Sequence, residues 1–379
     1  MGNNFKFIIS GIVLIVCISC NEEKKPKANI ANTSEARTKP EVSVEDTSVI
    51  AKKPENIETP KGMVWVPGGI IAQGAVPQDK GAMGHEKPVH KVAVDGFFMD
   101  ITEVTNAQFK KFVNETKYKT VAEREIDWEE MKKQLPEGTP KPHDSIMQPG
   151  SLTFKQAKST VANLYDFSQW WQWTIGADWQ HPNGPESSIK GKDNDPVVHI
   201  AFEDAQAYCQ WANRRLPTEA EWERAAKGEH LNSTYSWGDE DTQLSKKANT
   251  WEGEFPVTNS KTDGYVDRAP VKSFPPNDFG LYDMAGNVWE WTGDWYNTNY
   301  YNEIGNTITK NPQGASSPYN ERDPYAKEKV MKGGSFLCNA SYCASYRISA
   351  RMATSLDSSL EHLGFRTVAT ADMVPAKNN

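Results

Sequence analysis

The chain of 379 residues has few cysteines, no excess of basic residues and only one long apolar run. With 5 cysteines it is not a disulfide-dense scaffold. Lys+Arg 42 against Asp+Glu 50 gives a formal net charge of -8, which argues against a basic nucleic-acid-binding protein. A hydrophobic fraction of 37% supports a large core but excludes a polytopic membrane protein. The composition therefore indicates a soluble globular body.

Aromatic and turn-forming residues are abundant instead. The chain contains 13 Trp, 26 Gly and 23 Pro, a mixture typical of a turn-rich architecture without long helices or a parallel sheet. The length is compatible with two or three domains or with one large domain. Composition does not decide between them.

The apolar run covers residues 5–19 and follows a short polar start with Lys6. It is too short to span a bilayer and is typical of a secretory signal. The Ser19-Cys20 junction resembles a bacterial lipoprotein signal over residues 1–19 with Cys20 as the lipidated residue, although Cys17 departs from the usual Leu. An ordinary cleaved signal peptide is the alternative. We expect a lipid-anchored protein of the bacterial cell envelope, periplasmic or at the outer membrane.

Residues 20–60 are rich in Lys, Glu, Thr, Ser and Pro and predict a disordered tether. Without a second linker, residues 61–371 are one predicted domain, followed by a tail at 372–379. Patterning predicts strands within 63–74 and 91–105, and helices over 106–116, 202–215 and 215–228. Thr105 caps the first helix, and Thr218 with Glu221 forms a capping box in the last, which Gly228 ends. Long loops dominate the rest, including 124–175 and 297–328, so the expected fold class is α+β and low in regular structure.

Cys338 and Cys343 stand four residues apart in a loop rich in Gly, Ser and Tyr. Three interpretations compete for them: a disulfide closing a small loop, a structural zinc site that would need further ligands, and a two-thiolate site for copper(I), which soft sulfur selects. Two unrelated free thiols are also compatible with the spacing. The spacing alone does not establish an enzyme.

Longer stretches of the body resemble the formylglycine-generating enzyme (sulfatase-modifying factor) family along nearly its whole length. That resemblance implies a single loop-rich domain similar to a C-type-lectin variant. The cysteine pair within GGSFLCNASYC is the motif most specific for activity. The other matching stretches are MVWVPGG, FFMDITEVTNAQF, ADWQHPNGP, DPVVHIAFEDAQAYCQWANRRLPTEAEWERAAKG, ANTWEGEFPVTN, GLYDMAGNVWEWTGDWY and LGFR.

The resemblance implies a copper- and O2-dependent oxidase that converts a cysteine in a Cys-x-Pro-x-Arg segment of an unfolded sulfatase to Cα-formylglycine. Cys338 and Cys343 would bind copper(I), and the substrate thiolate would be the third ligand. Ser335 would hydrogen-bond in the oxygen pocket, and Tyr342 and Trp289 would wall it. Without the resemblance, Ser335 is a turn hydroxyl and Trp289 an ordinary core aromatic.

The same resemblance implies two structural Ca2+ sites made of carboxylate, amide and carbonyl oxygens, which calcium prefers. Taken without it, these residues are more often turn or cap residues. An Asp at 283 replaces the usual Asn and makes the second site more negative. The first site comprises Asn249, Thr250, Asp263 and Tyr265, and the second comprises Asp283, Gly286, Val288 and Glu290.

Some positions depart from the family pattern. Cys209 lacks its disulfide partner because Thr367 stands there, and Ala226 and Ile348 replace a second bridge, so Cys209 is expected in the core. His362 replaces a common Asn, and Gln180 a common Arg.

Two other functions were weighed against the oxidase. One is an iron-dependent sulfoxide synthase, for which only His85, His90, His181 and His199 are available as ligands. The other is a non-catalytic envelope lipoprotein of the same fold that acts as a binding or motility scaffold.

Overall fold

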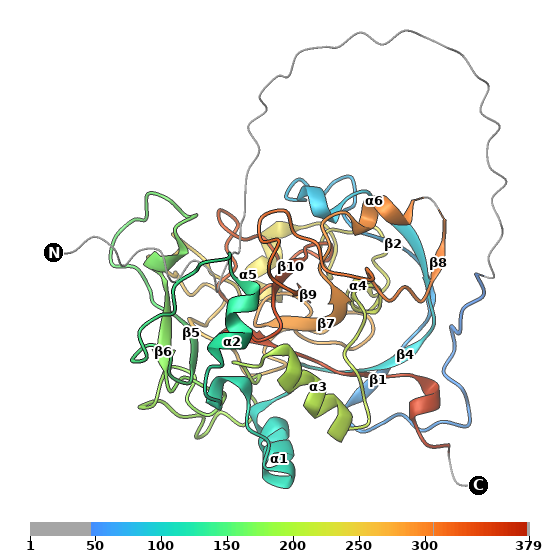
Figure 1. Ribbon diagram of the computed structural model, residues 1–379. Helices are drawn as coiled ribbons and strands as arrows, with labels where there is room; N and C mark the ends of the chain where they lie inside the picture. Colours follow the sequence, from blue (N-terminus) through green and yellow to red (C-terminus); the bar gives the residue numbers. More distant parts are fainter. Residues whose placement is uncertain (1–46, 306, 377–379) are drawn as a thin grey trace, which may run out of the picture.

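The computed structural model describes residues 47–305 and 307–376 (Figure 1). The predicted signal segment and the predicted lipidated Cys20 lie outside the described residues. No helix among the described residues is both long and apolar enough to cross a membrane.

Four small sheets and six short α-helices make up the regular structure of the described part (Figure 1). The first sheet has the order β1 (Met63–Val66), β4 (Phe97–Asp100), β12 (Val368–Ala369). The second is β2 (Gly69–Gln73), β3 (His90–Val94), β8 (Thr309–Lys310). The third is β10 (Met352–Ser355), β9 (Glu328–Lys332), β7 (Trp289–Trp295), β11 (Leu363–Gly364). The fourth pairs β5 (Gly150–Phe154) with β6 (Trp171–Ile175).

The predicted helices form where their caps stand. Thr105 caps α1 (Asn106–Thr116), and Thr218 with Glu221 forms the predicted capping box of α4 (Glu219–Lys227), which ends at Gly228. The helix predicted over 202–215 is shorter, because α3 (Phe202–Trp211) stops before Asn213, which has a φ of 52°. Arg215 then pairs its backbone with Val368 beside the first sheet. Short helices that sequence patterning does not predict are α2 (Trp128–Met131), α5 (Leu244–Lys247) and α6 (Tyr300–Ile304).

The strands predicted within 63–74 are both present but belong to different sheets, β1 pairing with β4 and β2 with β3. The segment 124–175, predicted as a long loop, contains α2 and the β5–β6 pair, which stand together at one side of the molecule (Figure 1). The largest buried cluster combines aromatic residues of this segment with β7 and the cysteine loop. The segment is thus part of the body around the candidate site.

The domain boundaries predicted at residues 61 and 371 are too narrow. The backbone of Ile50 hydrogen-bonds to Asp95 and Gly96, and Ile57, 6% exposed, bridges to Ala376. Burial of Ile57 against the carboxyl-terminal segment removes apolar surface from water, which composition alone does not reveal. Part of the predicted tether, residues 47–60, therefore packs on the body, and so does the start of the predicted tail.

Candidate active site

Two consecutive turns after β9 bring the predicted cysteines together. Gly333 and Gly334 leave the strand with φ of 91° and 75°, and a Cβ on Gly334 would come within 2.8 Å of the backbone at 345–346. Only glycine tolerates both the positive φ and this approach. The amide of Cys338 then donates to the Ser335 carbonyl at 2.9 Å, and that of Cys343 to the Asn339 carbonyl at 2.7 Å. The two turns place both sulfurs on the same side of the loop.

The sulfur atoms of Cys338 and Cys343 lie 2.9 Å apart, and both residues are free thiols. Cys338 is 2% and Cys343 7% exposed. The hydrogen bond from Cys338 lowers the pKa of Cys343, while burial and the neighbouring sulfur raise the pKa of Cys338. The pair therefore favours one thiolate and one thiol, a soft donor set.

This donor set suits a soft ion with two ligands better than zinc. Among the described residues, no group of three or more His, Cys, Asp and Glu side chains is arranged to hold a metal, whereas structural zinc takes four ligands. A linear ion needs sulfurs about 4.6 Å apart, twice a metal–sulfur bond of roughly 2.3 Å. The two side chains would therefore have to separate to admit it.

The three accessory residues predicted for the site lie in different surroundings. The amide of Ser335 donates to Cys338 Sγ at 3.3 Å, and its hydroxyl is 3.2 Å from Nδ1 of His362. The Tyr342 ring stacks on Phe255 at 4.5 Å and lines the cavity described below. Trp289 is buried in the shared core at the start of β7 and is not among the residues lining that cavity.

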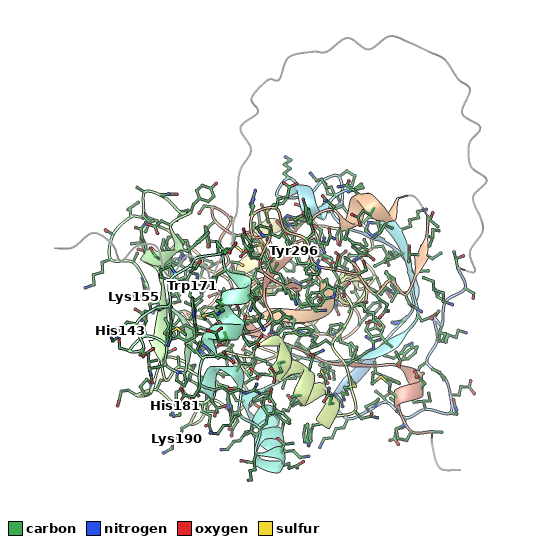
Figure 2. All side chains as sticks on the ribbon, in the orientation of Figure 1. His143, Lys155, Trp171, His181, Lys190 and Tyr296 are labelled. Atoms are coloured by element: carbon green, nitrogen blue, oxygen red, sulfur yellow. The ribbon has the colours of Figure 1, made fainter. Side chains whose placement is uncertain are left out.

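A cavity of about 1000 Å3 opens beside Cys343. Tyr342 and Tyr296 contribute to its lining, and Figure 2 shows Tyr296 near β9 and β10. A second cavity of about 770 Å3 is lined largely by the 124–135 segment and by 353–359. Glu328 and Ala353 line both, so the two cavities adjoin.

Glu328 is a buried carboxylate that sequence reasoning missed. It is 4% exposed and accepts a hydrogen bond from Asn320 at 2.7 Å. Burial and, to a lesser degree, Asp323 raise the pKa of Glu328 to about 7. No ion pair with Glu328 occurs within the part of the chain that the structure describes. A buried carboxylate of this kind is suited to bind a cation in the cavity.

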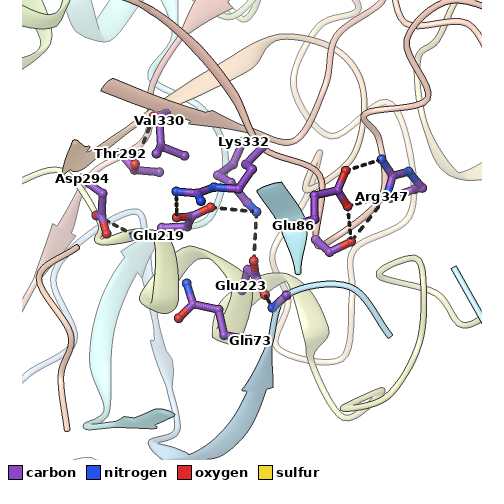
Figure 3. Close-up of polar contacts among 12 residues, drawn as sticks. Gln73, Glu86, Glu219, Glu223, Thr292, Asp294, Val330, Lys332 and Arg347 are labelled. Atoms are coloured by element: carbon purple, nitrogen blue, oxygen red, sulfur yellow. Dashed lines mark hydrogen bonds and ion pairs between the residues drawn. The ribbon is translucent and has the colours of Figure 1, made fainter. Parts of the chain in front are cut away.

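Behind Cys343, a buried ion network supports the loop (Figure 3). The Arg347 guanidinium contacts Asp79 at 2.6 Å and Glu86 at 2.7 Å and 2.8 Å. Ser349 hydrogen-bonds both carboxylates. Burial opposes ionisation of Glu86, but the hydrogen bonds from Arg347 hold its pKa below the ordinary value. The positive charge also favours the Cys343 thiolate. Sequence reasoning missed this network because its partners are more than 260 residues apart.

The residues predicted for the first calcium site do gather. Both oxygens of Asp263 accept backbone amide hydrogens, from Thr250 and Tyr265, each at 2.9 Å. Asn249 donates its side-chain amide to the Asp267 carbonyl at 2.9 Å. Burial raises the pKa of Asp263, and the buried Thr250 hydroxyl has no hydrogen-bond partner among the described residues. These oxygens fit a hard cation.

At the second predicted site, Asp283 faces Glu103, a carboxylate that sequence reasoning missed. Burial, followed by the charge of Asp283, raises the pKa of Glu103, whose Oε2 is buried without a partner among the described residues. Glu290 differs, because Arg366 binds both of its oxygens, at 2.6 Å and 2.7 Å. Three carboxylates thus share one guanidinium, and the excess negative charge fits a cation near Asp283 and Glu103 better than at Glu290. The remaining predicted members, Gly286 and Val288, lie on the connecting loop.

Both predicted calcium groups are tied to the cysteine loop. Asn249 donates to the Asn287 side chain at 3.1 Å. The Phe336 amide donates to the Asn287 carbonyl at 2.9 Å, and the Trp251 amide to the Cys338 carbonyl at 3.0 Å. The conformation of these loops therefore positions the sulfurs.

The departures from the family pattern are accommodated locally. Cys209 is a free, buried residue of the main core, as predicted, and Ala226 and Ile348 are buried in a second cluster. Thr367 hydrogen-bonds to Asp100, and the amide of Gln180 to Asp178. The four histidines considered for iron do not form a cluster within the described ranges.

Comparisons with known proteins agree with this geometry. Residues 47–371 match the family model of the sulfatase-modifying factor enzyme 1-like domain. The chain is 39% identical to a formylglycine-generating enzyme of Bos taurus, over 94% of this chain and 86% of the relative. It is also 35% identical to an inactive C-alpha-formylglycine-generating enzyme 2 of Mus musculus, over 82% of this chain and 86% of that protein.

Among solved structures, PvdO from Pseudomonas aeruginosa matches with a TM-score of 0.55 and 21% identity, covering 84% of this chain and 100% of PvdO. This likeness confirms the predicted α+β, loop-rich fold. Because the family model spans most of the sequence and the curated relatives match over most of their own length, the chain belongs to the formylglycine-generating enzyme (sulfatase-modifying factor) family.

Proposed function

We propose that the protein oxidises a cysteine in a Cys-x-Pro-x-Arg segment of unfolded sulfatases to Cα-formylglycine and thereby activates them. The observation that carries this proposal is the pair of free thiols at 2.9 Å, one of which reaches a cavity of about 1000 Å3. An inactive relative shows that family membership alone does not decide activity. The cysteine pair is the feature on which we base it.

In this proposal Cys338 and Cys343 hold copper(I), which supplies the one-electron chemistry with O2 that side chains lack. Conversion of –CH2–SH to –CHO releases hydrogen sulfide, and dioxygen takes up two electrons from the substrate carbon and two from an added thiol. The substrate peptide occupies the cavity, with its cysteine beside Cys343. Tyr342, packed between Phe255 and Trp170, excludes water from one side.

The direct test uses the full chain loaded with copper(I), a Cys-x-Pro-x-Arg peptide, a thiol reductant and air. Mass spectrometry should show loss of the thiol and gain of the aldehyde, and anaerobic samples should show neither. Absence of aldehyde from the aerobic, copper-loaded sample would refute the proposed function.

We further propose that Glu328 binds the substrate arginine. Replacing Glu328 by Gln should raise KM for the arginine peptide about tenfold or more, since hydrogen bonds to charged groups contribute about 1.5–3 kcal/mol. A peptide with Ala for Arg should bind both proteins equally. Because the pKa of Glu328 is about 7, KM for the arginine peptide should fall as pH rises from 6 to 8 and the carboxylate ionises. Steady-state kinetics measures all three.

Glu321→Gln is the matched control, because Glu321 lines the same cavity but is exposed. Exposed charges contribute little, so its KM should change by less than about twofold. Equal effects of the two variants, or an effect of Glu328→Gln that persists with the Ala peptide, would remove Glu328 from arginine recognition.

We propose calcium at the two oxygen-rich groups, with Asp263 and Asp283 as the charged ligands. Chelation should lower Tm, because an ion bound at 100 times its Kd stabilises the fold by about 2.7 kcal/mol. Readdition of Ca2+ but not Mg2+ should restore it. Differential scanning fluorimetry measures the shift, and Asp263→Asn should reduce it. An unchanged Tm in both chelated samples would contradict calcium binding.

Lipidation at Cys20 stays a prediction, as does an envelope location. If Cys20 carries acyl chains, the oxidase would act at a membrane surface, where exported sulfatases emerge unfolded.

A further inference from the structure

His362 is a buried histidine in direct contact with Ser335. Its Nδ1 lies 3.2 Å from Ser335 Oγ, and its ring packs edge-to-face on Trp171 at 4.9 Å. Figure 2 places Trp171 on the β5–β6 side of the molecule. The residue is 4% exposed. The position of its ring is therefore held by packing as well as by the hydrogen bond.

The ring of His362 is neutral in this environment. Burial and the nearby Arg268 lower the pKa of His362 to about 3. Arg268 is itself fixed, since it donates to the Glu361 carbonyl at 3.0 Å and pairs with Asp267 and Glu361. A neutral imidazole carries one N–H, on either Nδ1 or Nε2.

The surroundings distinguish the two tautomers. Nε2 of His362 is buried without a hydrogen-bond partner among the described residues. A proton on Nε2 would leave a buried N–H donor unsatisfied, which is rare and costs about 1–3 kcal/mol. A proton on Nδ1 instead meets Ser335 Oγ. The Nδ1–H tautomer is therefore favoured.

The tautomer decides what the Ser335 hydroxyl can do. Ser335 Oγ already accepts the Leu337 amide hydrogen at 3.3 Å. If Nδ1–H also donates to it, both lone pairs are used and the hydroxyl hydrogen is left for a third group. The opposite tautomer would consume that hydrogen. Ser335 is adjacent to the sulfurs, because its amide donates to Cys338 Sγ.

We propose that His362 is a positioning residue whose Nδ1–H donates to Ser335 and so directs the Ser335 hydroxyl hydrogen toward the reaction space at the cysteine pair. This inference rests on the proposed function for its kinetic consequence, but not for its structural content. An Asn here could also donate through its side-chain amide, whereas a phenyl ring could not.

The first test is structural and needs neither copper nor turnover. Long-range 1H–15N correlation NMR of the metal-free protein with labelled histidine distinguishes the tautomers, with His362→Asn identifying the signal. We expect protonated Nδ1 in the wild type. Protonated Nε2 would overturn the proposal, whatever the outcome for catalysis.

The second test is kinetic. His362→Phe should lower kcat/KM for O2 about tenfold, the loss expected for one hydrogen bond, with KM for the peptide unchanged. His362→Asn should recover most of the loss. Because His362 acts through Ser335, adding His362→Phe to Ser335→Ala should have little further effect.

Multiplying effects in that double variant would overturn the proposal, as would a change confined to the peptide KM. Thermal melts of each variant check that the fold is retained. Failure of the wild type to form aldehyde would refute the proposed function alone, since the NMR result stands independently.

Discussion

Replacing Cys343 by alanine is expected to abolish aldehyde formation and to weaken copper(I) binding by about 10²–10⁴-fold. The two sulfurs come from one loop, so binding by the second is intramolecular, and losing one ligand forfeits that effective concentration. Competition with a chromogenic copper(I) chelator measures the affinity, and mass spectrometry of the peptide measures turnover. Cys338→Ala should behave in the same way, because the 2.9 Å pair acts as a unit.

Cys209→Ala is the matched control, because Cys209 is also a free, buried cysteine of the main core. Burial raises the pKa of its thiol, which keeps it protonated and a poor ligand. This variant should retain copper(I) binding and activity, with only a modest loss of stability. Undiminished turnover in Cys343→Ala would refute the two-thiolate site.

The second large effect is expected from Arg347→Met, which should lower the free energy of unfolding by about 3–5 kcal/mol. The substitution leaves Asp79 and Glu86 buried without their cation, and removing one partner of a buried pair leaves an uncompensated charge. The pKa of Cys343 should also rise, because Arg347 helps to lower it. Denaturant unfolding measures stability, and the pH dependence of thiol alkylation measures the pKa.

Lys111→Met is the control for this prediction, since the Lys111–Glu115 pair at 3.9 Å is exposed on both sides. Such pairs contribute about 0–1 kcal/mol. The contribution of Glu86 should also depend on pH. Its folded pKa lies below 4.5, so its stabilisation is present above pH 4.5 and is lost as pH falls through the folded pKa. A loss in Arg347→Met no larger than in Lys111→Met would contradict a stabilising role of the network.

Local signals in the sequence predicted the elements whose ends depend on near neighbours. Thr105, Thr218 and Gly228 mark helix ends because caps satisfy backbone groups within a few residues. The cysteine pair belongs to the same class, since two turns within one loop join Cys338 to Cys343. Thus the family, the α+β fold class and the central donor pair could be inferred before the structure.

The tertiary structure alone decided the surroundings of that pair. Glu328 becomes a candidate arginine ligand only where two cavities meet, and Glu103 becomes relevant only beside Asp283. Arg347 and Glu86 are separated by 261 residues, and Ile57 meets Ala376 across almost the whole chain. Burial and charge pairing depend on which distant segments are brought together, and no short-range pattern encodes that. The sequence by itself determined which groups can carry the chemistry, whereas the packing determined their protonation, their access to a peptide and their supports.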